Sequence, residues 1–239
     1  MKLKRLFIFA LVFVVAFSFV ACSKDKKTNN SNEFDGPEWN NDPVEVPLAM
    51  EQSNDPHAQM AVSYVAMANS FGSYGGLFAP PRGAICTVNR DEEWTYTWGD
   101  GELSITLVIT ETSTHYHWEI YFDGFDGNMT YDNFLYIAAE QTLDGSSGSM
   151  TLYDPEMTEF LLFWQWSSDD NGVYHFMYEF YQEGKIVVEI NPDGSGFLEY
   201  YEYDNSAYWR SFRIEWTALG TGEWWGFDVL GNQIGYGLF

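Results

Sequence analysis

Residues 94–98 read WTYTW, residues 103–110 read LSITLVIT and residues 115–123 read HYHWEIYFD. In these stretches every second residue is aromatic or aliphatic, and the residues between are mostly polar. Because successive side chains of a strand point to opposite faces, the alternation predicts strands with one buried face and one wetter face. Aromatic residues make up 19% of the chain, and such residues fit pleated sheets. The sequence therefore predicts an all-β fold.

Short turns separate the alternating runs. Gly99-Asp100-Gly101, Asp170-Asn171-Gly172 and Asp193-Gly194 supply residues that tolerate positive φ. Strands at a spacing of about 10–13 residues leave no room for crossover helices, so neighbouring strands should be antiparallel. A flat sheet of roughly a dozen strands would expose its edges and a large apolar face. We therefore expect an antiparallel meander that forms either a closed barrel or an open, curved barrel.

One α-helix is predicted before the strands, at residues 56–71. Asp55 is a suitable N-cap, Pro56 suits the first helical position and Gly72 suits the end. Met60, Tyr64, Met67 and Phe71 recur at helical spacing, with alanines beside them. The alanine-rich side favours close packing against the sheet.

A weak internal repeat is visible in the second half of the chain. Residues 144–150 read DGSSGSM, and residues 192–197 read PDGSGF. The similarity has two explanations that the sequence leaves open. Either a four-strand unit was duplicated, or tight hairpins converged on the same turn residues.

The N-terminus has the form of a secretory signal. Lys2, Lys4 and Arg5 precede an apolar run, which ends at Phe19-Val20-Ala21-Cys22. These four residues resemble the lipobox of bacterial lipoproteins, although leucine is usual where Phe19 stands. The resemblance covers only this segment. It implies that a lipid such as palmitate is attached at Cys22, and that the chain is anchored in the bacterial cell envelope, with the outer membrane as the expected site.

This resemblance sets the expected domain organisation. Residues 1–21 would be the signal peptide, residues 22–53 a flexible tether rich in Asn, Asp and Pro, and residues 54–239 a single β-rich domain. A permanent transmembrane anchor is the alternative for the apolar run, but the run from Leu6 to Ala21 is shorter than the ~20 residues that a spanning helix needs. The terminal Gly235-Tyr236-Gly237-Leu238-Phe239 also resembles strands of outer-membrane barrels, against which the lipobox and the short loops argue.

Charge and cysteine content exclude several classes of function. The chain has 35 acidic residues against 11 lysines and arginines, a net charge of −24. Such a surface repels nucleic acid, so no nucleic-acid partner is expected. Of the two cysteines, Cys22 would carry the lipid, which leaves Cys86 in an apolar run as a structural cysteine. An intramolecular disulfide is therefore not expected.

Candidate metal ligands fall into two groups, and neither has a recognised spacing. His115, His117 and His175 are predicted on the polar face of strands, where three imidazoles could hold a transition metal. Asp123, Asp126, Asn128 and Asp132 could ligate calcium through oxygen. The histidines are equally consistent with solvent-facing positions on strands, and the Asp and Asn residues with ordinary turns. No metal or other cofactor is therefore expected.

The aromatic residues carry the functional hypotheses. No Gly-x-Ser-x-Gly, His-Glu-x-x-His or Walker-type motif is present, so a non-enzymatic binding domain is favoured over an envelope polysaccharide hydrolase. The first hypothesis is capture of an apolar or amphipathic ligand, such as a lipid, in a concave sheet face. The alternative is a surface glycan- or protein-binding module that uses exposed aromatics. The candidate ligand-binding residues are Tyr153, Tyr200, Trp209, Trp224 and Trp225.

Overall fold

The structure is a computed structural model that describes residues 37–39, 43–88, 93–157 and 159–239. In this part of the chain, two α-helices and a 3₁₀-helix precede thirteen strands. The helices are α2 (Leu48–Glu51), α3 (Pro56–Phe71) and η1 (Gly72–Phe78). The strands are β1 (Ile85–Val88), β2 (Glu93–Gly99), β3 (Leu103–Glu111), β4 (His115–Phe125), β5 (Thr130–Thr142), β6 (Ser147–Tyr153), β7 (Phe160–Ser168), β8 (Tyr174–Phe180), β9 (Gly184–Ile190), β10 (Gly196–Tyr203), β11 (Tyr208–Trp216), β12 (Gly222–Phe227) and β13 (Gln233–Leu238).

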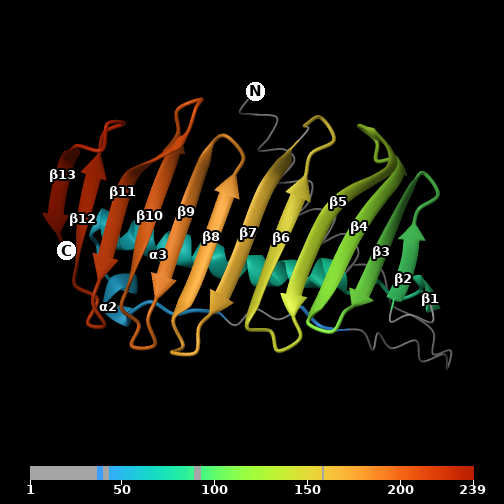
Figure 1. Cartoon of the computed structure of the whole chain (residues 1–239), viewed down its shortest axis with the longest axis horizontal. Coiled ribbons are helices and arrows are strands. Elements are labelled where there is room, and N and C mark those ends of the chain that lie inside the picture. The colour runs from blue at the N-terminus through green and yellow to red at the C-terminus, as the bar shows by residue number, and fades with distance from the viewer. Residues whose placement is uncertain (1–36, 40–42, 89–92, 158) are drawn as a thin grey trace.

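All described strands form one antiparallel sheet in which each strand lies beside its neighbours in sequence (Figure 1). The predicted all-β antiparallel meander is confirmed. Of its two expected forms the open one is found, because β1 and β13 lie at opposite edges and do not pair with each other. The closed barrel therefore does not form among the described strands.

The two similar segments of the sequence form similar hairpins. Gly145 and Gly194 have φ values of 73° and 82°, and each donates its backbone N–H to the residue three positions earlier. A serine hydroxyl then donates to the preceding aspartate in both turns, over 2.7 Å from Ser146 and 2.6 Å from Ser195. The repeated letters thus correspond to repeated turn geometry, which either duplication or convergence would produce.

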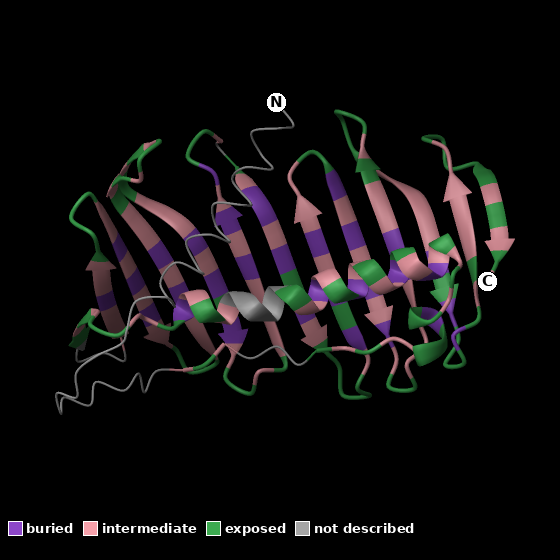
Figure 2. Ribbon diagram, turned by 180° about the vertical axis from the view of Figure 1, so that it is seen from behind, coloured by how far each residue is buried: buried purple, intermediate pink, exposed green. Residues whose placement is uncertain are grey.

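The apolar face of the sheet is covered by helix α3, which runs across the strands (Figure 2). The predicted helix at residues 56–71 is confirmed with the same bounds. Asp55 caps it, because its Oδ1 accepts the backbone N–H of His57 over 2.8 Å. Small side chains let the helix lie close to the sheet, and those that are buried are Ala58, Ala61, Val65 and Ala68.

A segment preceding the helix completes the core. The Trp39 ring lies 4.8–5.7 Å from those of Phe78, Trp118, Trp164 and Trp166. Asn69 of α3 holds the same segment through two hydrogen bonds to the Val44 backbone, of 2.9 and 2.8 Å. In α2, Met50 is fully buried.

The domain boundary predicted at residue 54 is therefore too late. Residues 43–53 and the described residues 37–39 belong to the folded domain, because Trp39, Val44, Val46 and Met50 pack into the core. The predicted signal peptide at residues 1–21, Cys22 and the first part of the tether lie outside the described residues.

Candidate functional site

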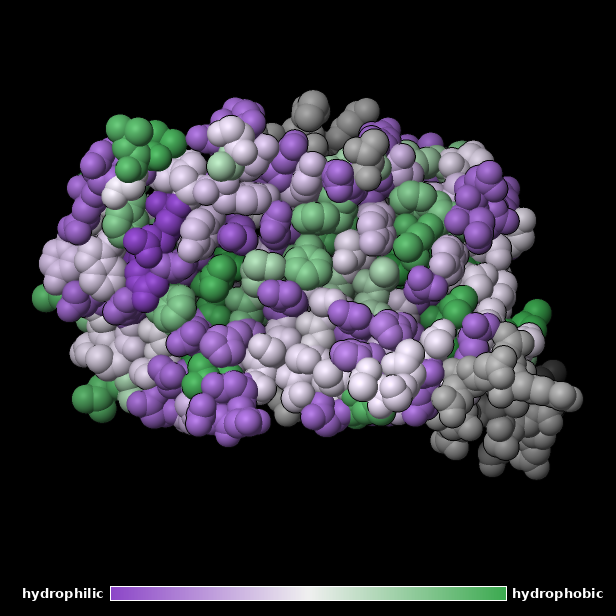
Figure 3. Space-filling model, in the orientation of Figure 1, coloured by the Kyte–Doolittle hydropathy of each residue, from purple (hydrophilic) through white to green (hydrophobic). Residues whose placement is uncertain are grey.

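The face of the sheet opposite α3 is the candidate site, and we call it the outer face. The register places ten side chains in one row across it, from β4 to β13. We call this the central row: His117, Glu140, Ser149, Gln165, Met177, Val187, Glu199, Arg213, Trp225 and Tyr236. Figure 3 views this face and shows hydrophobic side chains near its middle, with hydrophilic ones around them.

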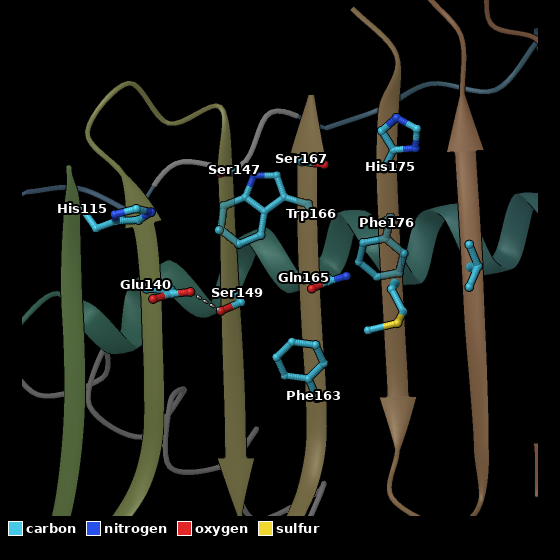
Figure 4. Close-up of a pocket in the computed structure, with 13 residues that line it drawn as sticks. His115, Glu140, Ser147, Ser149, Phe163, Gln165, Trp166, Ser167, His175 and Phe176 are labelled. Atoms are coloured by element: carbon cyan, nitrogen blue, oxygen red, sulfur yellow. Dashed lines mark hydrogen bonds between the residues drawn. The ribbon is translucent and has the colours of Figure 1, made fainter. Parts of the chain in front are cut away.

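A shallow hollow of about 520 Å³ lies over β4 to β9 on this face. Phe163, Met177 and Val187 supply apolar surface, and Glu140, Ser149 and Gln165 supply polar groups. Figure 4 shows Phe163, Glu140, Ser149 and Gln165 projecting from neighbouring strands, with His115 and His175 at opposite ends of the hollow. The hollow thus places an aromatic ring among hydrogen-bonding side chains.

Several polar side chains around the hollow make only long contacts with one another, although His115 Nδ1 lies 2.8 Å from the Thr114 hydroxyl. Ser149 donates to Glu140 over 3.4 Å, and His175 Nδ1 lies 3.3 Å from Glu189. The Gln165 side chain is exposed on β7, where its register neighbours are Ser149 and Met177. Long contacts and exposed amides leave capacity for hydrogen bonds to a polar ligand.

An ion-pair network adjoins the hollow on β10 and β11. Glu199 is 8% exposed and accepts hydrogen bonds from Arg210, Arg213 and the Tyr201 hydroxyl, over 2.6 Å from Arg210 and from Tyr201. Burial acts to raise the pKa of Glu199, but these hydrogen bonds outweigh it and hold the pKa below the ordinary 4.5. Burial, together with the hydrogen bond to Glu199, raises the pKa of Tyr201 to about 12. Glu199 is therefore a fixed carboxylate at neutral pH.

Cations and aromatic rings gather around this network. Within the described residues, every lysine and arginine except Arg82 lies here: Lys185, Arg210 and Arg213. Lys185 Nζ is 4.6 Å from the centre of the Tyr201 ring, and the Arg213 guanidinium is 4.3 Å from that of Phe197. Each distance is within the range of cation–π attraction. Three of the four basic residues that the structure describes thus lie together on one part of the outer face.

The five predicted ligand-binding aromatics do not form one site. Tyr200 and Trp224 lie on the helix-covered face, where the Tyr200 ring is 6.2 Å from that of Tyr64 and the Trp224 ring 4.1 Å from that of His57. Trp225 belongs to the central row on the opposite face. Tyr153 of β6 pairs with Phe160 of β7 beside a β-bulge, and Trp209 of β11 pairs with Glu202 of β10.

The predicted histidine ligands share a face without meeting. His115 and His117 lie on β4, with ring centres 6.0 Å apart, whereas His175 lies on β8, beyond the three strands β5 to β7. His117 instead lies 3.8 Å from Glu140. The described residues contain no cluster of three or more His, Cys, Asp or Glu side chains that could hold a metal ion.

The predicted calcium ligands act in turn formation. Asp126 Oδ1 accepts the backbone N–H groups of Asn128 and Met129, over 2.8 and 2.7 Å, and Oδ2 accepts the Tyr131 hydroxyl over 2.9 Å. Asp123 accepts the backbone N–H of Asn133 over 3.2 Å, and Asp132 is exposed on β5. The turn therefore already uses the oxygens of Asp126.

Apart from His115 and His175, sequence reasoning missed the residues that form the hollow and the network. Phe163, Gln165 and Met177 stand at alternating positions of β7 and β8. Their residue types do not indicate that the surface of the sheet is hollowed there. The network could have been suspected from the sequence, because basic residues are scarce in this part of the chain. Three of the few basic residues after residue 54 fall between positions 185 and 213.

No protein-family model matches the chain, and no curated protein matches it. Among the described residues, no helix has the length and apolar character required to cross a bilayer.

Proposed function

We propose that the chain is a lipid-anchored, non-enzymatic module of the bacterial cell envelope that binds glycans with its outer face. The observation that carries the proposal is the hollow, which places Phe163 beside Ser149, Gln165 and Glu140. A sugar offers C–H groups that pack on an aromatic ring, and hydroxyls that pair with amides and carboxylates. The open shape of the hollow suits a chain of sugars that lies across several strands.

The hypothesis of an apolar ligand in the concave face has less support. The space between α3 and the sheet is filled by the protein's own side chains, since Trp118, Trp164 and Phe78 are at most 1% exposed. A lipid would have to displace this packed core, at a cost of several kcal/mol. The exposed outer face needs no such rearrangement.

Binding to insoluble polysaccharides and to a glycan array tests the proposal. The full chain, solubilised in mild detergent, should bind at least one glycan. Phe163→Ala and Gln165→Ala should each weaken that binding about tenfold or more, which corresponds to ~1.4 kcal/mol. Trp225→Ala, which removes an aromatic ring of the same face outside the hollow, is the matched control and should bind as the parent does.

Two results would contradict the proposed site. The hollow is not the site if Trp225→Ala abolishes binding while Phe163→Ala does not. Glycan binding itself is refuted if the parent chain, shown to be folded by a cooperative thermal transition, binds no glycan on the array and no insoluble polysaccharide.

The anchor is tested separately. Radiolabelled palmitate should be incorporated into the parent chain and not into Cys22→Ala, because the acylated thiol would be missing. Incorporation into Cys22→Ala would refute the lipobox reading and leave the glycan proposal standing.

A further inference from the structure

Strand β13 forms an edge of the sheet that differs from the rest of the surface. Ile234, Tyr236 and Leu238 are 71%, 50% and 67% exposed, and Leu219 and Leu230, in the turns before and after β12, are 81% and 82% exposed. Residues 229–239 contain no charged side chain, although the chain as a whole has a net charge of −24. Natural edge strands are usually protected by charge, proline, a β-bulge or a covering segment, and within the described residues the stretch from Gly235 to Leu238 has none of them.

The hydrogen-bond pattern shows which backbone groups of β13 point outward. Gly222 of β12 and Phe239 exchange both backbone hydrogen bonds, each of 3.0 Å. Hydrogen-bonded and non-bonded pairs alternate along an antiparallel ladder, so Gly237 also bonds to β12. The N–H and C=O groups of Tyr236 and Leu238 therefore point away from the sheet, and a β-bulge near Gln233 ends this regular stretch.

We propose that β13 pairs with β13 of a second copy of this chain, antiparallel and centred on Gly237. In this register Tyr236 of each copy lies opposite Leu238 of the other, so that both outward residues of each edge pair in full. Four backbone hydrogen bonds form across a two-fold axis, as in an isologous dimer. In any other two-fold symmetric register, either Tyr236 or Leu238 would have no outward-facing residue of the regular stretch opposite it.

The side chains fit this self-pairing on both faces. Gly237 would meet Gly237 of the second copy, and glycines allow the close approach of a non-bonded pair. On the same face the Trp224 ring already lies over Gly237, where an added Cβ would be 2.4 Å from its Nε1. On the outer face, Tyr236 of each copy would lie opposite Leu238 of the other. This gives two aromatic–aliphatic cross-strand pairs, which are favourable.

Charge also favours a second copy at this edge rather than elsewhere on the molecule. The nearest acidic side chain on the outer face is Glu223, which lies opposite Leu238 and accepts the Tyr236 hydroxyl over 3.2 Å. In the proposed register the two Glu223 residues are roughly 16 Å apart, from strand and residue spacings. This exceeds the screening length of about 8 Å at physiological ionic strength. Two copies can therefore meet at β13 without a close like-charge contact.

Disulfide trapping in membranes of expressing cells tests the pairing and its register. The full chain carries Cys86→Ala, so that its half-buried thiol is removed, together with Tyr236→Cys and Leu238→Cys. Opposed cysteines in the proposed register have Cα atoms about 5.5 Å apart, which a disulfide can bridge. Mild oxidation should convert most of this double variant to a covalent dimer on a non-reducing gel, and each single variant should give little dimer, because equivalent positions are offset by two residues.

Leu219→Cys with Leu230→Cys is the matched control, since both leucines are more exposed than Tyr236 and lie in turns. It should give little covalent dimer on the non-reducing gel, although its β13 edge is intact. The proposal is overturned if the control cross-links as efficiently as the edge variant. It is also overturned if the edge variant, folded as judged by protease resistance, gives no covalent dimer or cross-links to a protein of another mass.

Discussion

At the scale of single residues, glycines on the covered face of the sheet leave room for the aromatic rings of neighbouring strands. Gly148 pairs with Trp166, and Gly196 pairs with Trp216. A Cβ on Gly148 would lie 2.0 Å from the Trp166 ring, and one on Gly196 would lie 2.9 Å from the Trp216 ring. The missing side chain provides the space that the indole occupies, so the two residue types are needed as a pair.

We therefore expect Gly148→Ala to lower the free energy of unfolding by about 1–3 kcal/mol, the usual cost of overpacking. Chemical denaturation of the purified variant measures the change. Gly76→Ala is the control, because an added Cβ there has nothing within 4 Å, and it should differ from the parent by less than about 0.5 kcal/mol. Equal effects of the two substitutions would contradict the steric explanation.

The Glu199 carboxylate makes a pH-dependent contribution to stability. Its folded pKa lies below the ordinary 4.5, so its stabilising effect is complete above that value and disappears as pH falls through the folded pKa. Glu199→Gln should lower the free energy of unfolding by about 1–2 kcal/mol at pH 7, because two arginines lose their shared charged partner.

Denaturation at pH 7 and near pH 3 checks this prediction. The difference between the parent and Glu199→Gln should shrink at the lower pH, since the carboxylate of the unfolded chain then binds protons more readily than that of the folded chain. Glu215→Gln is the control: Glu215 also contacts Arg213, over 2.6 Å, but its side chain is 47% exposed, so the change should stay below about 1 kcal/mol. A difference that grows on acidification would contradict the sign of the pKa shift.

At the scale of elements, the close approach of α3 to the sheet depends on its small residues. Ala61 is fully buried, whereas Ala66 of the same helix is exposed. Ala61→Leu should destabilise the protein by about 1–3 kcal/mol, because the added atoms have no room against the strands. Ala66→Leu should be nearly neutral, since leucine and alanine are both good helix formers.

Thermal and chemical unfolding of the two variants provide the measurement. The pair is matched in chemistry and in helix, so a difference between them reports packing alone. If Ala61→Leu were tolerated as well as Ala66→Leu, the helix would not be held tightly against the sheet.

The strands and α3 could be read from the sequence because each has a strong local period. Other elements have no such signal. Trp39 and Met50 stand among prolines, asparagines and acidic residues, and only the tertiary contacts show that they pack into the core. Trp224 and Trp225 point to opposite faces of β12, but two adjacent tryptophans do not reveal which face is covered.

At the scale of the whole molecule, the choice between a closed and an open sheet could not be predicted either. Closure requires β1 and β13 to pair, which depends on the summed twist and stagger of all strands rather than on any single segment. The hollow on the outer face has the same origin. Its residues come from six strands, β4 to β9, so its shape is a property of the assembled sheet.

The meander also determines how stability should be distributed across the molecule. Each strand contacts mainly its neighbours in sequence, as the units of a repeat protein do. The central strands β7 to β9 have a partner on both sides and contribute Trp164, Phe176 and Val188 to the core, all at most 2% exposed. The edge strand β1 has one partner among the described strands, and its Ile85 is 72% exposed.

Hydrogen–deuterium exchange measured by mass spectrometry should therefore show a gradient. Peptides from β7 to β9 should exchange most slowly, at rates close to those of global unfolding, and peptides from β1 and β2 should exchange much faster through local opening. The unstructured limit is provided by the same peptides in denaturant. Uniform protection from β1 to β9 would show that the sheet unfolds as one cooperative unit, in which the helix-covered core couples all strands more strongly than their nearest-neighbour contacts imply.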